Sequence, residues 1–335
     1  MTPTNWLEFR SGAPNFQDPI LLEFRHAYEV FDEYSLPPRI VLAIGSVSKR
    51  RFLQSQHLKV KVPAESGVTL RPFTSSSVLI DCELHNVEAF KSNKAGPLLG
   101  NCLQHRLYVP LTSNSAKRKI SSLAQDLYWQ LLFPFASVVL LFIDDLGGAS
   151  HTLELLAGWV RKSTLDPGPC PPRILIVYDW CSNINPQQFE DQLRARLRAF
   201  LNGASDLEAC HTAFESMQLL SFSTSLPKLL LHIEEAFSVR DRLGFAFNPE
   251  HLRHLFQFAI SQAGQGNCRQ VDIQDAVRLR NPPSPRFADH ISRFITMSQR
   301  VGFTHDSIIA SALHLDANPP GMHRWHPLRS TAMQL

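Results

Sequence analysis

Apolar residues gather in five short runs along the first two thirds of the chain. The runs are RIVLAIG (39–45), SVLIDCEL (77–84), SVVLLFIDD (137–145), RILIVYDW (173–180) and MQLLSFSTS (217–225). They are almost continuously apolar and rich in β-branched residues, which is typical of parallel strands that are covered on both faces. We therefore expect strands at 39–45, 77–82, 137–144, 173–179 and 217–222.

Between the later runs, apolar residues recur at the spacing of a helix. Helices are expected over 116–133, 151–162, 187–202 and 226–243. The third shows the pattern clearly, because Phe189, Leu193 and Leu197 share one face and Gly203 can end the helix. Strands that alternate with helices imply right-handed crossovers. The expected fold class is therefore α/β, a three-layer, doubly wound and mostly parallel sheet.

From about residue 246 the pattern becomes purely helical. Asn248 can cap a helix that begins at Pro249, and the residues from Leu252 to Ile260 give this helix an apolar stripe. Further helices are expected over 271–280, 286–301 and 304–315. We therefore divide the chain into a helical or loop lead-in (1–35), an α/β domain (36–245), an all-α subdomain (246–316) and an irregular tail (317–335).

Residues 127–143 are strongly apolar, but they contain Gln130 and Pro134 and stop at two aspartates. A membrane span needs about 20 apolar residues. A helix that ends near Pro134, followed by a buried strand, fits this stretch better. The start of the chain also lacks the pattern of a secretory signal, and its six cysteines include no C-x-x-C pair. These features predict a soluble, cytoplasmic protein without a transmembrane segment.

The net charge and the spacing of the histidines bear on whether the chain binds nucleic acid or a metal ion. Lys and Arg exceed Asp and Glu by only 33 − 30 = 3, and the basic runs are scattered. We therefore expect no nucleic-acid partner. The pairs His251 with His254 and His323 with His326 have no third ligand nearby, so no metal site is expected.

The first apolar run leads into GSVSKRR, at the position of a phosphate-binding loop. A Walker A loop, G-x-x-x-x-G-K-[ST], uses glycines for backbone approach, Lys for charge and a hydroxyl for Mg²⁺. Alignment on Lys49 puts Ser48 at the second glycine and Arg50 at the hydroxyl. Gly45 and Lys49 therefore remain weak candidates for binding phosphate, without the groups that magnesium-dependent hydrolysis needs.

Acidic residues near the ends of two runs are a second candidate feature. Asp81 and Asp144 stand where P-loop enzymes place Mg²⁺-binding aspartates, and residues 144–147 fit the D-x-x-G pattern of GTPases. An aspartate at a strand end also caps turns. After the fourth run the chain reads CSNINP instead of N-K-x-D. The layout is that of a P-loop GTPase-like domain whose chemistry is degenerate.

The segment GGASHT (147–152) is a third candidate, because Ser150 stands in a partial G-x-S-x-G pattern between a strand and a helix. The second glycine is missing, and Ser150 lies seven residues beyond Ile143, the expected strand end. Ser150 is therefore a weak candidate nucleophile, and capping of helix 151–162 is the alternative.

The segments LIDCELH, LLFPFASVVLLFIDDLGG, PRILIVYDW and IIASALHLDANPPGMH, in this order, resemble a group of fungal multidomain proteins. These are patatin-like or FabD/lysophospholipase-like proteins, and the resemblance is to the region ahead of their phospholipase domain. The family's catalytic G-x-S-x-G and D-G-[GA] motifs are absent here. The resemblance therefore implies a non-catalytic accessory module whose partner is another protein or an in-cis phospholipase domain.

The sequence thus predicts a pseudo-nucleotide-binding interaction module with no cofactor and no catalytic residue. Two alternatives stay open. One is a residual switch domain that binds GTP or ATP with Mg²⁺, and the other is a lipid-acting serine hydrolase that uses Ser150.

Overall fold

The structure is a computed structural model, and its chain divides into two compact units, Met1–Val271 and Asp272–Leu335. It describes residues 4–10, 20–56, 67–83, 102–107, 125–165, 168, 170–179, 191, 195, 199, 213–265, 269–273, 276, 286–299 and 306.

The first unit is built on a nine-stranded mixed sheet. Its strands run in the order β6-β2-β1-β4-β5-β3-β7-β8-β9. Their bounds are β1 Thr4–Arg10, β2 Ile20–Phe24, β3 Arg39–Gly45, β4 Gly67–Thr74, β5 Ser77–Glu83, β6 Cys102–Arg106, β7 Val138–Phe142, β8 Arg173–Tyr178 and β9 Ser216–Ser221.

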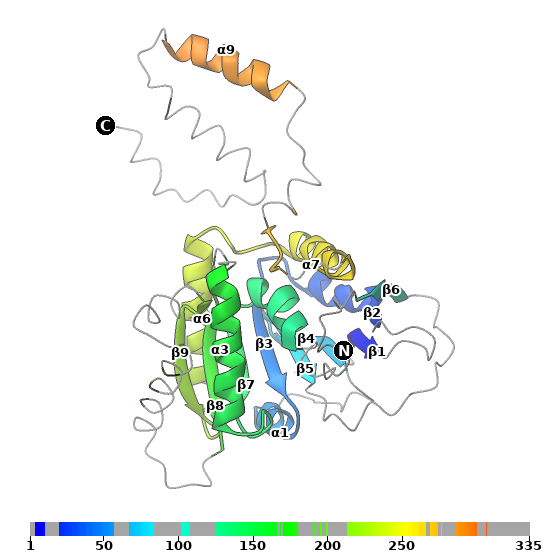
Figure 1. Cartoon of the computed structure of the whole chain (residues 1–335), viewed down its shortest axis with the longest axis vertical. Coiled ribbons are helices and arrows are strands. Elements are labelled where there is room, and N and C mark those ends of the chain that lie inside the picture. The colour runs from blue at the N-terminus through cyan, green and yellow to red at the C-terminus, as the bar shows by residue number, and fades with distance from the viewer. Residues whose placement is uncertain are drawn as a thin grey trace. The chain divides into compact units, whose positions relative to one another are not determined.

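The five strands expected from the apolar runs are confirmed, and they form the parallel half of the sheet (Figure 1). Here β3 pairs with β5 and β7, β7 with β8, and β8 with β9, all in parallel. Among these five the spatial order is second, first, third, fourth, fifth. The chain places β5 on one side of β3 and then β7 on the other side. The order in which strands are added to the sheet therefore reverses direction between β3 and β7. In doubly wound sheets, ligands bind outside the carboxyl ends of the strands at such a point.

The other half of the sheet is antiparallel, and the sequence patterns did not predict it. Strand β4 pairs with β5 and β1, β1 with β2, and β2 with β6, all antiparallel. The sheet is therefore evenly mixed rather than mostly parallel. Residues 1–35 are not a helical or loop lead-in, since they supply β1 and β2 and then the 3-10 helix η1 (Arg25–Glu33).

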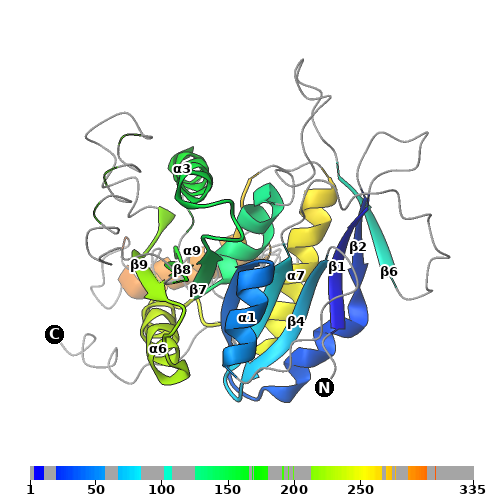
Figure 2. The ribbon, with the colours of Figure 1, turned by 90° about the horizontal axis from the view of Figure 1, so that it is seen from below.

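Helices cover both faces of the parallel strands. Helices α1 (Val47–Ser55) and α6 (Leu226–Arg242) pack on one face, where Phe52 and Ile233 join a core with Val41 and Leu140. Helix α3 (Ala149–Leu165) covers the opposite face (Figure 2). This arrangement explains why the five strands are apolar on both sides.

The apolar stretch 127–143 folds inside this unit. Residues Tyr128–Leu132 form a π-helical turn (η3), Phe133–Phe135 a 3-10 turn (η4), and β7 follows. The buried guanidinium of Arg240 donates to the carbonyl oxygens of Pro134 at 2.7 Å and Ala136 at 3.0 Å. The expected helix end near Pro134 and the strand after it are both present. The first part of the expected helix 116–133, and most of helix 187–202, lie outside the described residues.

Helix α7 (Pro249–Gly264) is capped by Asn248, whose side chain accepts a hydrogen bond from the His251 N–H at 2.8 Å. Its Phe256 packs against the rings of Trp6 and Phe135, with centroids 4.9 and 4.7 Å apart. Helix α7 therefore belongs to the first unit, and the division falls at residue 271 instead of the expected 246.

In the second unit the structure describes one helix, α9 (Phe287–Gln299), within the expected span 286–301. Its Phe294 and Met297 are exposed. The expected helices 271–280 and 304–315, and the tail 317–335, lie outside the described residues except at a few isolated positions. Across the described part of the chain, no helix has the length and apolar character needed to span a membrane.

Candidate functional site

The turn from β3 into α1 lies at the carboxyl ends of the parallel strands. It is beside the point between β3 and β7 where the strand order reverses. Strand β3 ends at Gly45, Ser46 follows, and α1 begins at Val47. The first N–H groups of a helix have no partner within it. Together with the helix dipole they form a binding site for negatively charged groups.

A carboxylate of the chain itself occupies this position. Asp145 lies in the loop after β7, and its Oδ2 accepts the backbone N–H of Ser46 at 2.6 Å and of Lys49 at 2.8 Å. Its Oδ1 accepts the N–H of Ser48 at 2.9 Å. The Ser46 hydroxyl lies 3.4 Å from the same Oδ1. Three backbone donors therefore converge on one carboxylate, at the place where a phosphate loop would hold a phosphate.

Gly45 makes this close approach possible. A Cβ at residue 45 would stand 2.6 Å from Asp145 Oδ2 and 2.9 Å from Lys49 Cβ. Both distances are shorter than side chains tolerate. The role of Gly45 is thus to admit the Asp145 carboxylate, which the motif alignment did not show.

Lys49 points away from the turn. Its side chain is 0% exposed, and its Nζ lies 2.6 Å from Asp81 Oδ1 and 3.1 Å from Glu83 Oε2. The same ammonium donates to the Cys82 carbonyl oxygen at 2.7 Å. In a phosphate loop the lysine ammonium would point at the bound phosphate. Here the positive charge of Lys49 is neutralised by carboxylates at the end of β5.

The ion pairs around Lys49 continue on both sides. Arg71 pairs with Asp81, and Arg50 pairs with Glu83. The hydrogen bond to Glu83 raises the pKa of Arg50. A buried charge is tolerated only when it is paired and hydrogen-bonded in this way. Because Arg71 and Lys49 both engage Asp81, this carboxylate serves as the centre of an internal ion-pair network.

Asp144, the other predicted magnesium ligand, lies elsewhere. It is exposed, and it is near Asp179, which follows β8. Partial desolvation raises the pKa of the Asp144 carboxyl, and the charges of Asp179 and Asp145 raise it further, whereas a hydrogen bond with the Asp179 backbone lowers it. The acidic neighbours that act on Asp144 are thus Asp179 and Asp145, whereas Asp81 is paired with Lys49 and Arg71. No group of three or more metal-ligating side chains occurs among the residues it describes.

Ser150 lies in the first turn of α3, which begins at Ala149, so it is inside the helix and not its cap. The neighbouring His151 places its ring Nδ1 3.0 Å from the carbonyl oxygen of Gly147. No hydrogen bond joins Ser150 to a histidine in the described part of the chain. Among the described residues, Ser150 therefore has no positioned base of the kind that a serine nucleophile requires.

The residues that define the site were only partly found from sequence. Gly45, Lys49 and Asp81 were singled out, whereas Asp145, Glu83 and Arg71 were not assigned a role. Asp145 carried one signal, its position directly after a strand beside the reversal point. Arg71 carried none, because β4 was not predicted.

Neither a protein family nor a curated protein matches this chain. Among solved structures it is similar to an ADP-ribosylation-factor-like GTP-binding protein, the small COPII coat GTPase SAR1 of Encephalitozoon cuniculi, in complex with GDP. The likeness covers 65% of this chain and 88% of that one, with 9% sequence identity and a TM-score of 0.32. These values mark a weak similarity.

Proposed function

We propose that this chain is a non-catalytic interaction module in which the β3–α1 turn is a pseudo-nucleotide site. The observation that carries the proposal is the Asp145 carboxylate, which uses the backbone N–H groups of Ser46, Ser48 and Lys49. A nucleotide phosphate needs the same donors. It would have to displace a carboxylate or lie against it, and two negative groups in contact repel each other.

Two further features support a site without nucleotide chemistry. Lys49 is held by Asp81 and Glu83, so moving it to a phosphate would take one of the two paired cations away from each of two buried carboxylates. Arg50 stands at the position of the magnesium-binding hydroxyl and is paired with Glu83. Neither residue can take its usual role while these ion pairs stay intact.

The proposed partner follows from the sequence resemblance to the region ahead of a phospholipase domain. In such an arrangement this module contributes binding and positioning, and the hydrolytic residues are on the partner domain. Co-purification of the chain with a patatin-like phospholipase domain tests this part. The absence of a complex at micromolar concentrations of both would remove that partner while leaving the closed turn unaffected.

The nucleotide claim is tested by calorimetric titration of GTP and ATP, with and without Mg²⁺, into the wild-type chain. The expected result is no binding, or weak binding that ignores Mg²⁺ and disappears in salt. Arg51→Ala is the matched control, because Arg51 is exposed on α1 beside the turn and can attract anions non-specifically. Micromolar, magnesium-dependent binding that survives in Arg51→Ala would overturn the proposal and support a residual nucleotide switch.

A further inference from the structure

A cavity of about 540 Å³ lies in the antiparallel half of the first unit, between η1, β6 and α7. This volume is typical of pockets that bind small molecules, about 300–1,000 Å³. Side chains of both charges, a thiol and an apolar side chain line the cavity, namely Arg25, Glu29, Asp32, Arg253, Cys102 and Leu103. None of these residues belongs to the β3–α1 turn, so the cavity is separate from the pseudo-nucleotide site.

The 3-10 helix η1 places its two kinds of charge on different ridges. In a 3-10 helix, side chains three residues apart eclipse one another. Arg25 therefore lies in line with Tyr28, whereas Glu29 lies in line with Asp32, one residue further round the helix. All four line the cavity. A guanidinium and a pair of carboxylates thus meet the same space from neighbouring ridges.

One charge of each sign in this cavity is already paired. On α7, the Arg253 guanidinium donates to the Asp32 carboxylate and, at 3.3 Å, to the Tyr28 carbonyl oxygen. Its Nε is buried and has no acceptor among the described residues. Arg25 and Glu29 are exposed, and in the described part of the chain they form no hydrogen bond or ion pair. The cavity therefore offers one unpaired guanidinium and one unpaired carboxylate.

This set of groups is complementary to a zwitterion. A carboxylate of the ligand can accept from the Arg25 guanidinium, whose planar fork matches its two oxygens. An ammonium of the ligand can pair with Glu29. Leu103, which is 37% exposed, offers apolar contact between them. A ligand with a single charge would form only one of the two ion pairs.

We propose that this cavity binds a small zwitterion, an amino acid or a short peptide with free ends, through Arg25 and Glu29. The inference goes beyond the proposed function, because it adds a ligand site on the half of the sheet that the pseudo-nucleotide turn does not use. The two sites share no residue, so either proposal can fail without the other.

The test uses Cys102 of the full-length chain as a reporter, because this free thiol lines the cavity and is partly exposed. Alkylation of Cys102 by iodoacetamide is followed by peptide mass spectrometry while dialanine is titrated. The matched control ligands are N-acetyl-dialanine, which lacks the ammonium, and dialanine amide, which lacks the carboxylate. Cys82 is fully buried, so its labelling would report unfolding.

Dialanine should slow the alkylation of Cys102 in a saturable way and leave Cys82 unlabelled. Each control ligand should require about tenfold higher concentrations or more, because it lacks one charge-assisted contact. Arg25→Gln and Glu29→Gln should weaken protection by dialanine to a similar degree. Arg51→Gln should behave as wild type, since Arg51 is an exposed arginine of α1 outside the cavity.

Three results would overturn this site. They are no protection by dialanine at millimolar concentrations, equal protection by all three compounds, and protection that is unchanged in either Arg25→Gln or Glu29→Gln. None of them bears on the closed β3–α1 turn, which the nucleotide titration tests separately.

Discussion

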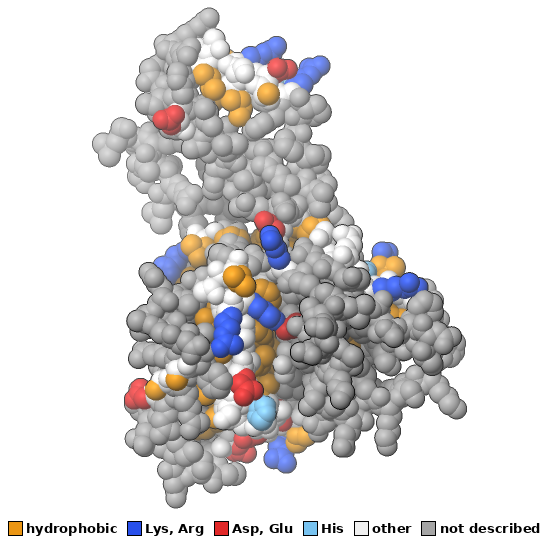
Figure 3. Space-filling view, in the orientation of Figure 1, with side chains coloured by type: hydrophobic (Ala, Val, Ile, Leu, Met, Phe, Trp, Pro, Cys, Tyr) orange, Lys and Arg blue, Asp and Glu red, His pale blue; other side chains and the backbone are white. Residues whose placement is uncertain are grey.

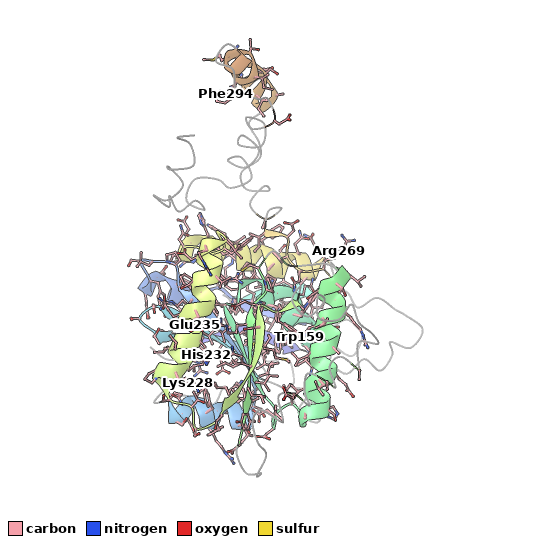
Figure 4. All side chains as sticks on the ribbon, turned by 90° about the vertical axis from the view of Figure 1, so that its left-hand side faces the viewer. Trp159, Lys228, His232, Glu235, Arg269 and Phe294 are labelled. Carbon is pink, nitrogen blue, oxygen red and sulfur yellow. The ribbon has the colours of Figure 1, made fainter. Side chains whose placement is uncertain are left out.

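His232 shows how a single side chain makes stability depend on pH. It lies on α6 with Lys228 and Glu235 (Figure 4). Burial lowers the pKa of His232, and the positive charge of Arg173 lowers it further. Its ring Nδ1 is buried and has no hydrogen-bond partner in the described part of the structure. The folded chain therefore favours the neutral ring.

We expect acid to destabilise the fold through this residue. The unfolded chain protonates His232 near its ordinary pKa of about 6.5, whereas the folded chain does so only at lower pH. Below that value the unfolded state binds more protons, so the free energy of unfolding falls as the pH drops. Urea denaturation at a series of pH values should show a shallower fall in His232→Gln. Identical pH profiles for the two chains would contradict this expectation.

At the same scale, sequence could identify Gly45 and Lys49 as unusual but could not assign their partners. Motif alignment assumes that a lysine after a strand-to-helix turn faces a phosphate. The distance in sequence from Lys49 to Asp81 and Glu83 hides the ion pairs that turn its side chain inward. The role of Lys49 is set by its pairing with buried charges, which depends on the tertiary structure and not on the local sequence.

At the scale of elements, the β3–α1 turn depends on the absence of a side chain at residue 45. Gly45→Ala would place a Cβ 2.6 Å from Asp145 Oδ2 and 3.1 Å from Phe142 Cβ. Overpacking of this kind costs about 1–3 kcal/mol of unfolding free energy. Chemical denaturation of the variant should show a loss within that range.

Gly158→Ala is the control for this prediction. Gly158 lies within α3, and a Cβ there would meet no atom within 4 Å. Alanine in a helix is favoured over glycine by about 0.5–1 kcal/mol, so this variant should be slightly more stable than wild type. A neutral Gly45→Ala beside a stabilised Gly158→Ala would show that the carboxylate does not need the space.

The parallel strands were predictable because continuous apolar runs report burial on both faces. The antiparallel strands were not, because β1 and β4 mix polar and apolar residues and β4 contains Pro72 in its interior. Proline is normally evidence against a strand interior. Pairing of β4 with both β5 and β1 outweighs that local preference.

At the scale of the whole molecule, the first unit should fold without the second. Its strands, α7 and the candidate site all lie within Met1–Val271. A chain ending at residue 271 should therefore unfold in a single cooperative transition. Figure 3 shows one face of this unit, where both basic and acidic side chains lie over α3.

A chain ending at residue 245 should be clearly less stable. It lacks α7 and thus the fully buried Phe256, and it uncovers Trp6, Phe31 and Phe135, whose rings contact Phe256. Removing a buried phenylalanine alone costs about 3–5 kcal/mol. Thermal unfolding of both fragments measures the difference. Equal stability would place the end of the folded unit at 245, before α7.

The claim that Asp145 fills the turn is tested most directly by amide hydrogen exchange at Ser46, Ser48 and Lys49. Amides at the start of a helix ordinarily exchange fast, because no carbonyl of the helix accepts them. Here the carboxylate should protect them in the wild type, and Asp145→Ala should speed their exchange about tenfold or more. The Arg50 amide, which donates to the Ser46 carbonyl oxygen, should stay equally protected in both chains. Fast exchange at the three amides already in the wild type, or the same rates in both chains, would contradict the account.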